Sequence, residues 1–230
     1  DAALRLPQRR VLILEAEKLG CSPLDFAEAG IRISSLARTR QDGRYRRDQA
    51  RGFRILGRIY TYLGDYEKAI EVHEESLRLA REIPDSAASQ ARSLHKVGIV
   101  YNRIGDYAQA LTVYEQALDI LSDNENPQIE SRVFGDIAAL YLNLGEYQKA
   151  IDFRNKQIEI NRETGALQDL GNSLGGLGIV YQSNSDYYTA TNLFEEQLEI
   201  MQEIGALRGE ARALGNLGSD YQALGVYSEA

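Results

Sequence analysis

A forty-residue repeat constrains the fold of this chain more than any other feature of its sequence. Tyrosines recur at Tyr60, Tyr101, Tyr141, Tyr181 and Tyr221, at steps of 41, 40, 40 and 40 residues. Each copy has a second tyrosine six residues later and an alanine three residues after that. Five copies therefore start near residues 50, 91, 131, 171 and 211, and the fifth stops halfway at residue 230. A period of this length is typical of repeat architectures, in which each unit packs on its neighbours.

The second copy shows how one unit is expected to fold. Residues 91–104 place apolar side chains at spacings of three and four, which predicts a helix. Gly105 follows, where a left-handed residue ends a helix at little cost, and Asp106 is a good cap for a second helix over residues 107–121. Residues 124–127 then break the pattern. The sequence therefore predicts an all-α array of helix–turn–helix hairpins.

Small residues recur inside the first helix of each hairpin. They are Gly57, Gly98, Gly178 and Gly218, with Ala138 in the third copy. A glycine inside a helix costs about 1 kcal/mol relative to alanine. Glycine at one register in four copies therefore indicates the close approach of a neighbouring helix, and we expect the repeated alanine of the second helix to be the matching notch.

These residues resemble the tetratricopeptide repeat (TPR). Its signature of Leu-Gly, Tyr, Gly-Asp-Tyr and Ala appears in the first copy as Leu56-Gly57, Tyr60, Gly64-Asp65-Tyr66 and Ala69. The resemblance covers residues 50–230, although forty residues exceed the usual 34. Long repeats of this kind are similar to those of Pins/LGN-type adaptors, kinesin light chains and large bacterial TPR proteins.

The resemblance implies a right-handed superhelix whose concave face is lined by the first helix of each hairpin. The third copy departs from the pattern, because Arg154 replaces the aromatic residue found at Tyr114 and Phe194. Gln157 and Gln197 replace a second small alanine, as Ser76 does in the first copy. The hairpin of the third copy is therefore expected to pack more loosely.

Residues 1–49 fit the repeat less well. The segments Pro7–Leu19 and Pro23–Arg38 are predicted to be two helices. They are either a degenerate repeat or the end of a preceding domain, since the terminal units of an array are often atypical.

Charge is distributed unevenly along the chain. The net charge is −8, but residues 1–60 carry +6 and the remainder −14. A basic start on an acidic body favours an anionic partner or contact with another domain of the parent chain. The pI of about 5.0 and the absence of a nucleic-acid-binding motif argue against nucleic acid.

Two further features bear on location. No apolar run is long enough to span a bilayer, so no membrane partner is expected. The single cysteine, Cys21, fits a reducing compartment, which favours a cytoplasmic protein.

The expected concave face consists of polar positions on the first helices. They are Arg51, Arg54, Arg58, Tyr62, Arg92, His95, Lys96, Asn102, Arg103, Arg132, Asn143, Asn172, Gln182, Asn216 and Gln222. Arginine binds carboxylates in bidentate pairs, and side-chain amides can bond a peptide backbone. The first half of this face therefore favours an acidic protein or peptide segment, and the second half is rich in amides. The alternative interpretation is that these are ordinary solvated helix faces.

No catalytic or cofactor-binding pattern is predicted. The string Gly171-Asn172-Ser173-Leu174-Gly175 matches GxSxG but lies in a helix with no later histidine. His73 is expected in the core, and no metal-ligand spacing surrounds His95. We therefore expect a non-enzymatic interaction module without a cofactor or metal. The alternatives are a regulatory arm that controls an attached NTPase, protease or kinase, and an architectural or self-association module.

Overall fold

The computed structural model describes residues 43–123 and 126–225, with side chains from residue 46 onward. The helices expected over residues 7–19 and 23–38 lie outside the described residues, as do Tyr227 and Ala230. The chain divides into two compact units, residues 1–124 and 125–230. None of the described helices is long and apolar enough to cross a membrane.

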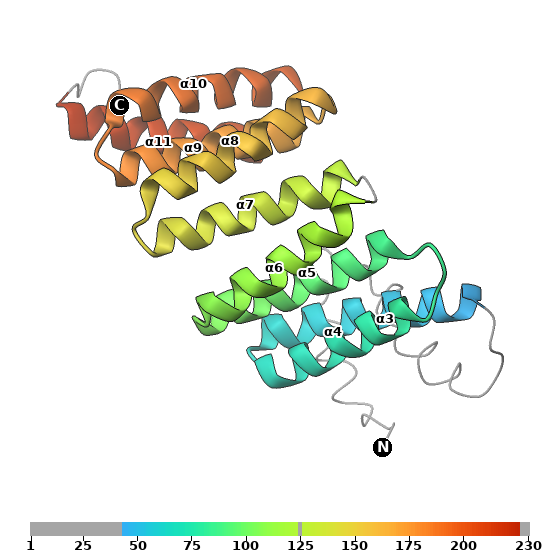
Figure 1. Ribbon diagram of the computed structural model, residues 1–230. Helices are drawn as coiled ribbons and strands as arrows, with labels where there is room; N and C mark the ends of the chain where they lie inside the picture. Colours follow the sequence, from blue (N-terminus) through green and yellow to red (C-terminus); the bar gives the residue numbers. More distant parts are fainter. Residues whose placement is uncertain (1–42, 124–125, 226–230) are drawn as a thin grey trace, which may run out of the picture. The chain divides into compact units, whose positions relative to one another are not determined.

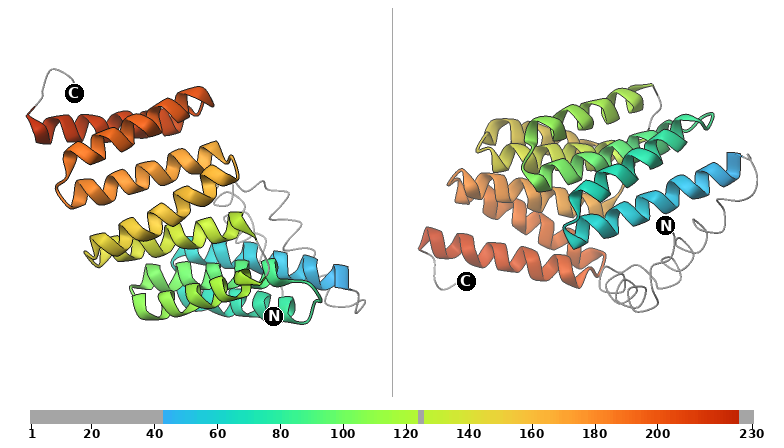
Figure 2. Two further views of the ribbon diagram at one scale, coloured as in Figure 1. Left: turned by 45° about the horizontal axis from the view of Figure 1, so that its top comes forward. Right: turned by 90° about the horizontal axis from the view of Figure 1, so that it is seen from below.

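The described residues form helical hairpins and no strand, which confirms the all-α prediction (Figure 1). The first unit contains α3 (Gly43–Leu63), α4 (Tyr66–Arg81), α5 (Ala87–Ile104) and α6 (Tyr107–Ser122). The second contains α7 (Pro127–Asn143), α8 (Tyr147–Glu163), α9 (Leu167–Ser183), α10 (Tyr187–Glu203) and α11 (Leu207–Leu224). Successive helices pair as expected for hairpins, and two further views show this pairing (Figure 2).

Local sequence accounts for the turns. Gly105 ends α5 in the left-handed conformation at φ +88°, and the carboxylate of Asp106 accepts a bond of 3.1 Å from the backbone N–H of Gln109. Other hairpins repeat this arrangement, as at Gly64 and Asp65. The helix starts were predicted less well, because α5 begins at Ala87, four residues before the expected start. The tyrosine repeat defines the register of a helix but not the residue at which it begins.

Each unit consists of two layers. In the first unit, α3 and α5 contact each other and α4 packs against both. In the second unit, α9 contacts α7 and α11, while α8 and α10 cover the other side. The first helices of successive hairpins therefore pack more closely together than the second helices do. We call the layer of first helices the inner layer of each unit and the layer of second helices the outer layer.

Glycines of the inner layer receive rings from the outer layer. A Cβ atom built on the glycine would lie 2.4–2.5 Å from the ring in three hairpins: Gly57 and His73, Gly98 and Tyr114, and Gly178 and Phe194. The close approach is confirmed, and the group that approaches each of these glycines is a ring of the paired helix. At Gly218 nothing among the described residues lies within 4 Å of the Cβ position.

The unusual glutamines are accommodated by a second set of glycines. A Cβ on Gly135 would lie 2.5 Å from Gln157 Nε2, and a Cβ on Gly175 would lie 2.4 Å from Gln197 Oε1. In the second copy the large and small residues are exchanged between the two helices. His95 stands in register with Gly135 and Gly175, and Ala117 stands in register with Gln157 and Gln197. The departures from the TPR pattern are therefore compensated locally by residue size.

Candidate functional site

One face of α3 carries a stripe of arginines. Arg47, Arg51, Arg54 and Arg58 follow one another at spacings of four, three and four, which places them on the same side of the helix. The whole helix contains six arginines and a single acid, Asp48. The sequence therefore places four positive charges along one side of the inner layer.

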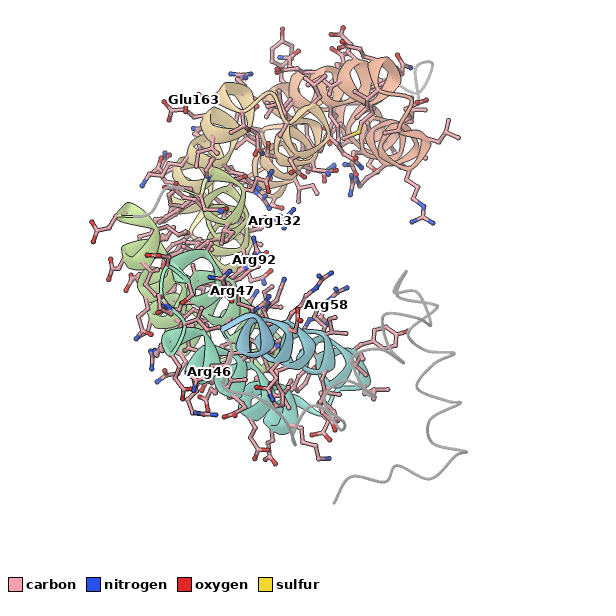
Figure 3. The ribbon with its side chains drawn as sticks, turned by 90° about the vertical axis from the view of Figure 1, so that its right-hand side faces the viewer. Arg46, Arg47, Arg58, Arg92, Arg132 and Glu163 are labelled. Atoms are coloured by element: carbon pink, nitrogen blue, oxygen red, sulfur yellow. The ribbon has the colours of Figure 1, made fainter. Side chains whose placement is uncertain are left out.

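Helix α5 adds further cations beside this stripe. It carries Arg92, Lys96 and Arg103 and no acid. Nη1 of Arg54 donates a bond of 3.0 Å to the hydroxyl of Ser89, which joins α3 to α5. Figure 3 shows Arg58 and Arg92 on the same side of this unit, with Arg46 away from them. We call Arg51, Arg54, Arg58 and Arg92 the basic face.

The charges of the basic face interact with one another. Burial, followed by the positive charges of Arg92 and Arg51, lowers the pKa of Arg54 to about 10. This repulsion shows that guanidinium groups from both helices lie within electrostatic range. A bound anion would relieve the repulsion.

His73 lies beneath these cations in the notch of Gly57. Burial, followed by the positive charges of Lys96, Arg54 and Arg58, lowers the pKa of His73 to about 3. The imidazole is therefore neutral at physiological pH. Its place in the core agrees with the prediction that it packs in the aromatic position.

The outer layer of this unit differs in its charge balance. On α4, Lys68 pairs with Asp65, and Arg78 pairs with Glu75 at 2.7 Å and Glu82 at 2.6 Å. Within the described part of the chain, Arg51, Arg58 and Arg92 are exposed and none of them forms an ion pair. Two cations of α4, Lys68 and Arg78, are thus paired with carboxylates, whereas the exposed arginines of the basic face are not.

The other predicted residues of this unit divide into accessible and buried groups. Tyr62 is 48% exposed and Arg103 is exposed, whereas Lys96 and Asn102 are half-buried. The prediction for His95 is wrong, because its side chain is only 3% exposed and its ring lies 6.0 Å from that of Tyr114. This ring contact places His95 toward α6 of the outer layer, where Ala117 stands at the position that Gln157 and Gln197 hold in later copies.

In the second unit most of the predicted binding residues are accessible. Arg132, Asn143, Asn172 and Gln222 are exposed, and Asn216 is half-buried. Asn172 accepts a short hydrogen bond from Nη2 of Arg212, which occupies the equivalent position on α11.

Gln182 serves the interior of the second unit. Its Nε2 donates a bond of 2.6 Å to Oδ1 of Asp220, which is 0% exposed. The prediction that Gln182 is available to a peptide is therefore wrong, because this amide satisfies a buried carboxylate. Sequence reasoning missed Asp220, although an acid where sister copies have Val100, Leu140 and Val180 was a usable signal.

The GxSxG string has no catalytic geometry. Ser173 is 1% exposed, its hydroxyl donates to the backbone oxygen of Leu170 at 2.8 Å, and it accepts a bond from Asn161 at 3.4 Å. This serine closes a buried polar network. In the ranges 43–123 and 126–225, no three His, Cys, Asp or Glu side chains gather as a metal site would require.

Known proteins share this fold. Crystal structures that resemble the chain include BtubC (BKLC) from P. vanneervenii, at a TM-score of 0.79 and 21% identity over 90% of this chain and 85% of that one. A putative kinesin light chain from P. anserina gives a TM-score of 0.64 at 22% identity, covering 79% and 89%. Aspartyl phosphate phosphatase F from Bacillus subtilis gives 0.74 at 14% identity, covering 95% and 60%.

Sequence comparison agrees with the fold. No curated protein sequence gives a significant match to the chain. Tetratricopeptide repeat profiles, however, match residues 48–123 and 169–230, and another matches residues 131–164. The chain therefore belongs to the tetratricopeptide repeat family and is a protein–protein interaction module built from stacked helix hairpins.

Proposed function

We propose that the first unit captures an acidic peptide segment on its basic face, without any chemical reaction. The observation that carries this proposal is the cluster of Arg51, Arg54, Arg58 and Arg92 on α3 and α5, in which burial, followed by the charges of Arg92 and Arg51, lowers the pKa of Arg54. The captured segment belongs either to a second protein or to another part of the parent chain.

Physical chemistry supports a carboxylate as the ligand of this surface. The planar guanidinium group bonds a carboxylate through two parallel N–H donors, which gives both affinity and geometric specificity. Arg54 is half-buried beside exposed Arg51 and Arg58, so a bound carboxylate would be partly desolvated and would interact more strongly than in water.

A structural neighbour supports recognition by an array of this kind. A Rap protein crystallised in complex with Competence and Sporulation Factor has a TM-score of 0.68 to this chain at 17% identity, over 97% of this chain and 67% of that one. That similarity concerns the fold, and the acidic character of the ligand proposed here rests on the arginines of this chain.

Charge reversal on the basic face tests the proposal. The double variant Arg58→Glu/Arg92→Glu is expected to bind a fluorescein-labelled Glu-Ala repeat peptide at least about tenfold more weakly, because two charge-assisted contacts become repulsive. Fluorescence anisotropy measures the affinity, and added salt should weaken binding to the wild-type protein. Helicity by circular dichroism should not change, since both side chains are exposed.

The matched control reverses two cations of the outer layer. Arg81→Glu/Lys149→Glu makes the same change in net charge on exposed positions of α4 and α8. It should bind the peptide as the wild-type protein does. Equal affinity of the Arg58→Glu/Arg92→Glu variant and the wild-type protein, or equal loss in both double variants, would disprove recognition by the basic face.

A further inference from the structure

Arg154 of the outer layer does not occupy the notch that its position would predict. Its counterparts Tyr114 and Phe194 fill glycine notches, but the third copy has Ala138 in place of the glycine. The guanidinium group of Arg154 lies instead against α9. A Cβ built on Gly176 would be 2.6 Å from Cζ of Arg154 and 2.9 Å from its Nε.

Gly176 lies on α9 of the inner layer, five residues before the repeated tyrosine Tyr181. Equivalent positions hold Ile55 in the first copy and the polar residues Lys96, Asp136 and Asn216 in three others, and all of them are half-buried, as Gly176 is. The guanidinium group of Arg154 thus takes the space in which a side chain of α9 would start. A residue of the outer layer supplies the charged group at a position of the inner layer.

In the first unit the positions equivalent to Arg154 and Gly176 also lie near each other, but the positive charge is on the inner-layer residue. There His73 is the outer-layer residue and Lys96 the inner-layer residue, and the charge of Lys96 helps to lower the pKa of His73. In the first unit the inner-layer residue, Lys96, is the cation and the outer-layer residue, His73, is a neutral ring. In the second unit the outer-layer residue, Arg154, is the cation and the inner-layer residue is Gly176. Two replacements therefore compensate each other: Arg154 stands where sister copies have a ring, and Gly176 stands where most of them have a polar side chain.

Arg154 retains unused hydrogen-bonding capacity. Its Nη1 donates a bond of 2.7 Å to Oε1 of Gln157, while its buried Nε has no partner among the described residues. Burial lowers the pKa of Arg154, and the carboxylate of Asp136 on α7 acts in the opposite direction. In the described part of the chain no ion pair involves Arg154. A buried donor without a partner costs free energy that an added acceptor recovers.

We propose that Arg154 is a carboxylate-binding residue of the second unit, because its guanidinium group takes the space of a side chain at Gly176 in the inner layer. The ligand is a glutamate or aspartate side chain of an acidic segment, so this inference rests on the proposed function for the nature of the ligand. The proposal gives a binding role to position 154, where the repeat pattern predicts a residue that packs in the core.

A direct test observes the arginine itself. The Nε–Hε resonance of Arg154 in the full chain is followed by NMR during titration with the peptide acetyl-Glu-Asp-Glu-Asp-amide. We expect this resonance and the backbone amide of Gly176 to shift together and to saturate. The uncharged peptide acetyl-Gln-Asn-Gln-Asn-amide should leave both in place. An Arg154 resonance that does not respond to the acidic peptide overturns the proposal.

Designed variants separate binding from packing. Arg154→Phe/Ala138→Gly restores the ring and notch of the sister copies, so it should fold with an unchanged or higher melting temperature and bind the acidic peptide about tenfold more weakly. Adding Gly176→Lys returns the charge to α9, as Lys96 provides it on α5, and should recover the lost affinity. These affinities are compared in the Arg58→Glu/Arg92→Glu background, where the basic face is removed. Unchanged affinity on adding Arg154→Phe/Ala138→Gly there contradicts the role of Arg154.

The two proposals fail independently. In the Arg58→Glu/Arg92→Glu background, the basic face is removed and Arg154 is intact. A shift of the Arg154 resonance in that background supports the Arg154 site, whether or not the anisotropy measurement supports the basic face. A resonance that does not shift in either background rejects the Arg154 site alone, because the anisotropy measurement judges the basic face separately.

Discussion

Gly98→Leu is expected to destabilise the protein by about 3 kcal/mol, at the upper end of typical overpacking costs. The Cβ of the new side chain would lie 2.4 Å from Cε1 of Tyr114, whose ring is 0% exposed and cannot move into solvent. Leucine is the better helix former by about 1 kcal/mol, but the steric conflict exceeds this gain. Urea denaturation followed by circular dichroism measures the free energy of unfolding.

Gly218→Ala is the matched control. Gly218 occupies the equivalent register on α11, and nothing among the described residues lies within 4 Å of its Cβ position. Alanine should therefore stabilise the protein by up to about 1 kcal/mol through helix propensity alone. If Gly98→Leu unfolded at the urea concentration of the wild-type protein, the ring-in-notch packing would be wrong.

Replacing the polar triad around Asp220 with the side chains of the sister copies is expected to stabilise the second unit by about 1–3 kcal/mol. Oδ1 of Asp220 accepts from Gln182 at 2.6 Å, and Oδ2 accepts from Thr191 at 3.5 Å. The equivalent positions between the third and fourth copies hold the packed apolar residues Leu142, Val180 and Ile151. The variant to test is Gln182→Leu/Asp220→Val/Thr191→Ile, again by urea denaturation.

The stability contributed by Asp220 depends on pH. Burial raises the pKa of this carboxyl, and the bonds from Gln182 and Thr191 offset only part of the rise. The folded state therefore holds the proton more tightly than the unfolded state, so stability is lost as the pH rises from the ordinary value of 3.8 through the folded pKa.

Asp220→Asn isolates this contribution because it removes the titration and retains the shape. Relative to the wild-type protein, it should gain stability between about pH 4 and neutrality and show no gain in stronger acid. The contribution of His73 cancels in this comparison, since both proteins contain it. A difference in unfolding free energy that does not vary with pH would mean that Asp220 titrates as an exposed carboxylate.

The secondary structure could be predicted because its determinants are local. Gly105, Asp106 and the apolar spacing of residues 107–121 act within a few residues of one another, and the structure forms the expected helix Tyr107–Ser122. The stripe of Arg51, Arg54 and Arg58 follows from helical geometry in the same way. The five-fold repetition made these local signals unambiguous.

The sequence by itself determined the hairpins, their register and the TPR family, since caps, left-handed glycines and helical stripes depend on neighbours along the chain. Only the tertiary structure decided which polar side chains are accessible. His95 is buried against α6, where its ring lies beside that of Tyr114, and Gln182 is occupied because Asp220 lies on the next hairpin. Arg154 reaches the inner layer because Gly176 has no side chain. Burial and pairing depend on residues brought together from different hairpins, whose sizes and charges vary from copy to copy while the repeat pattern does not.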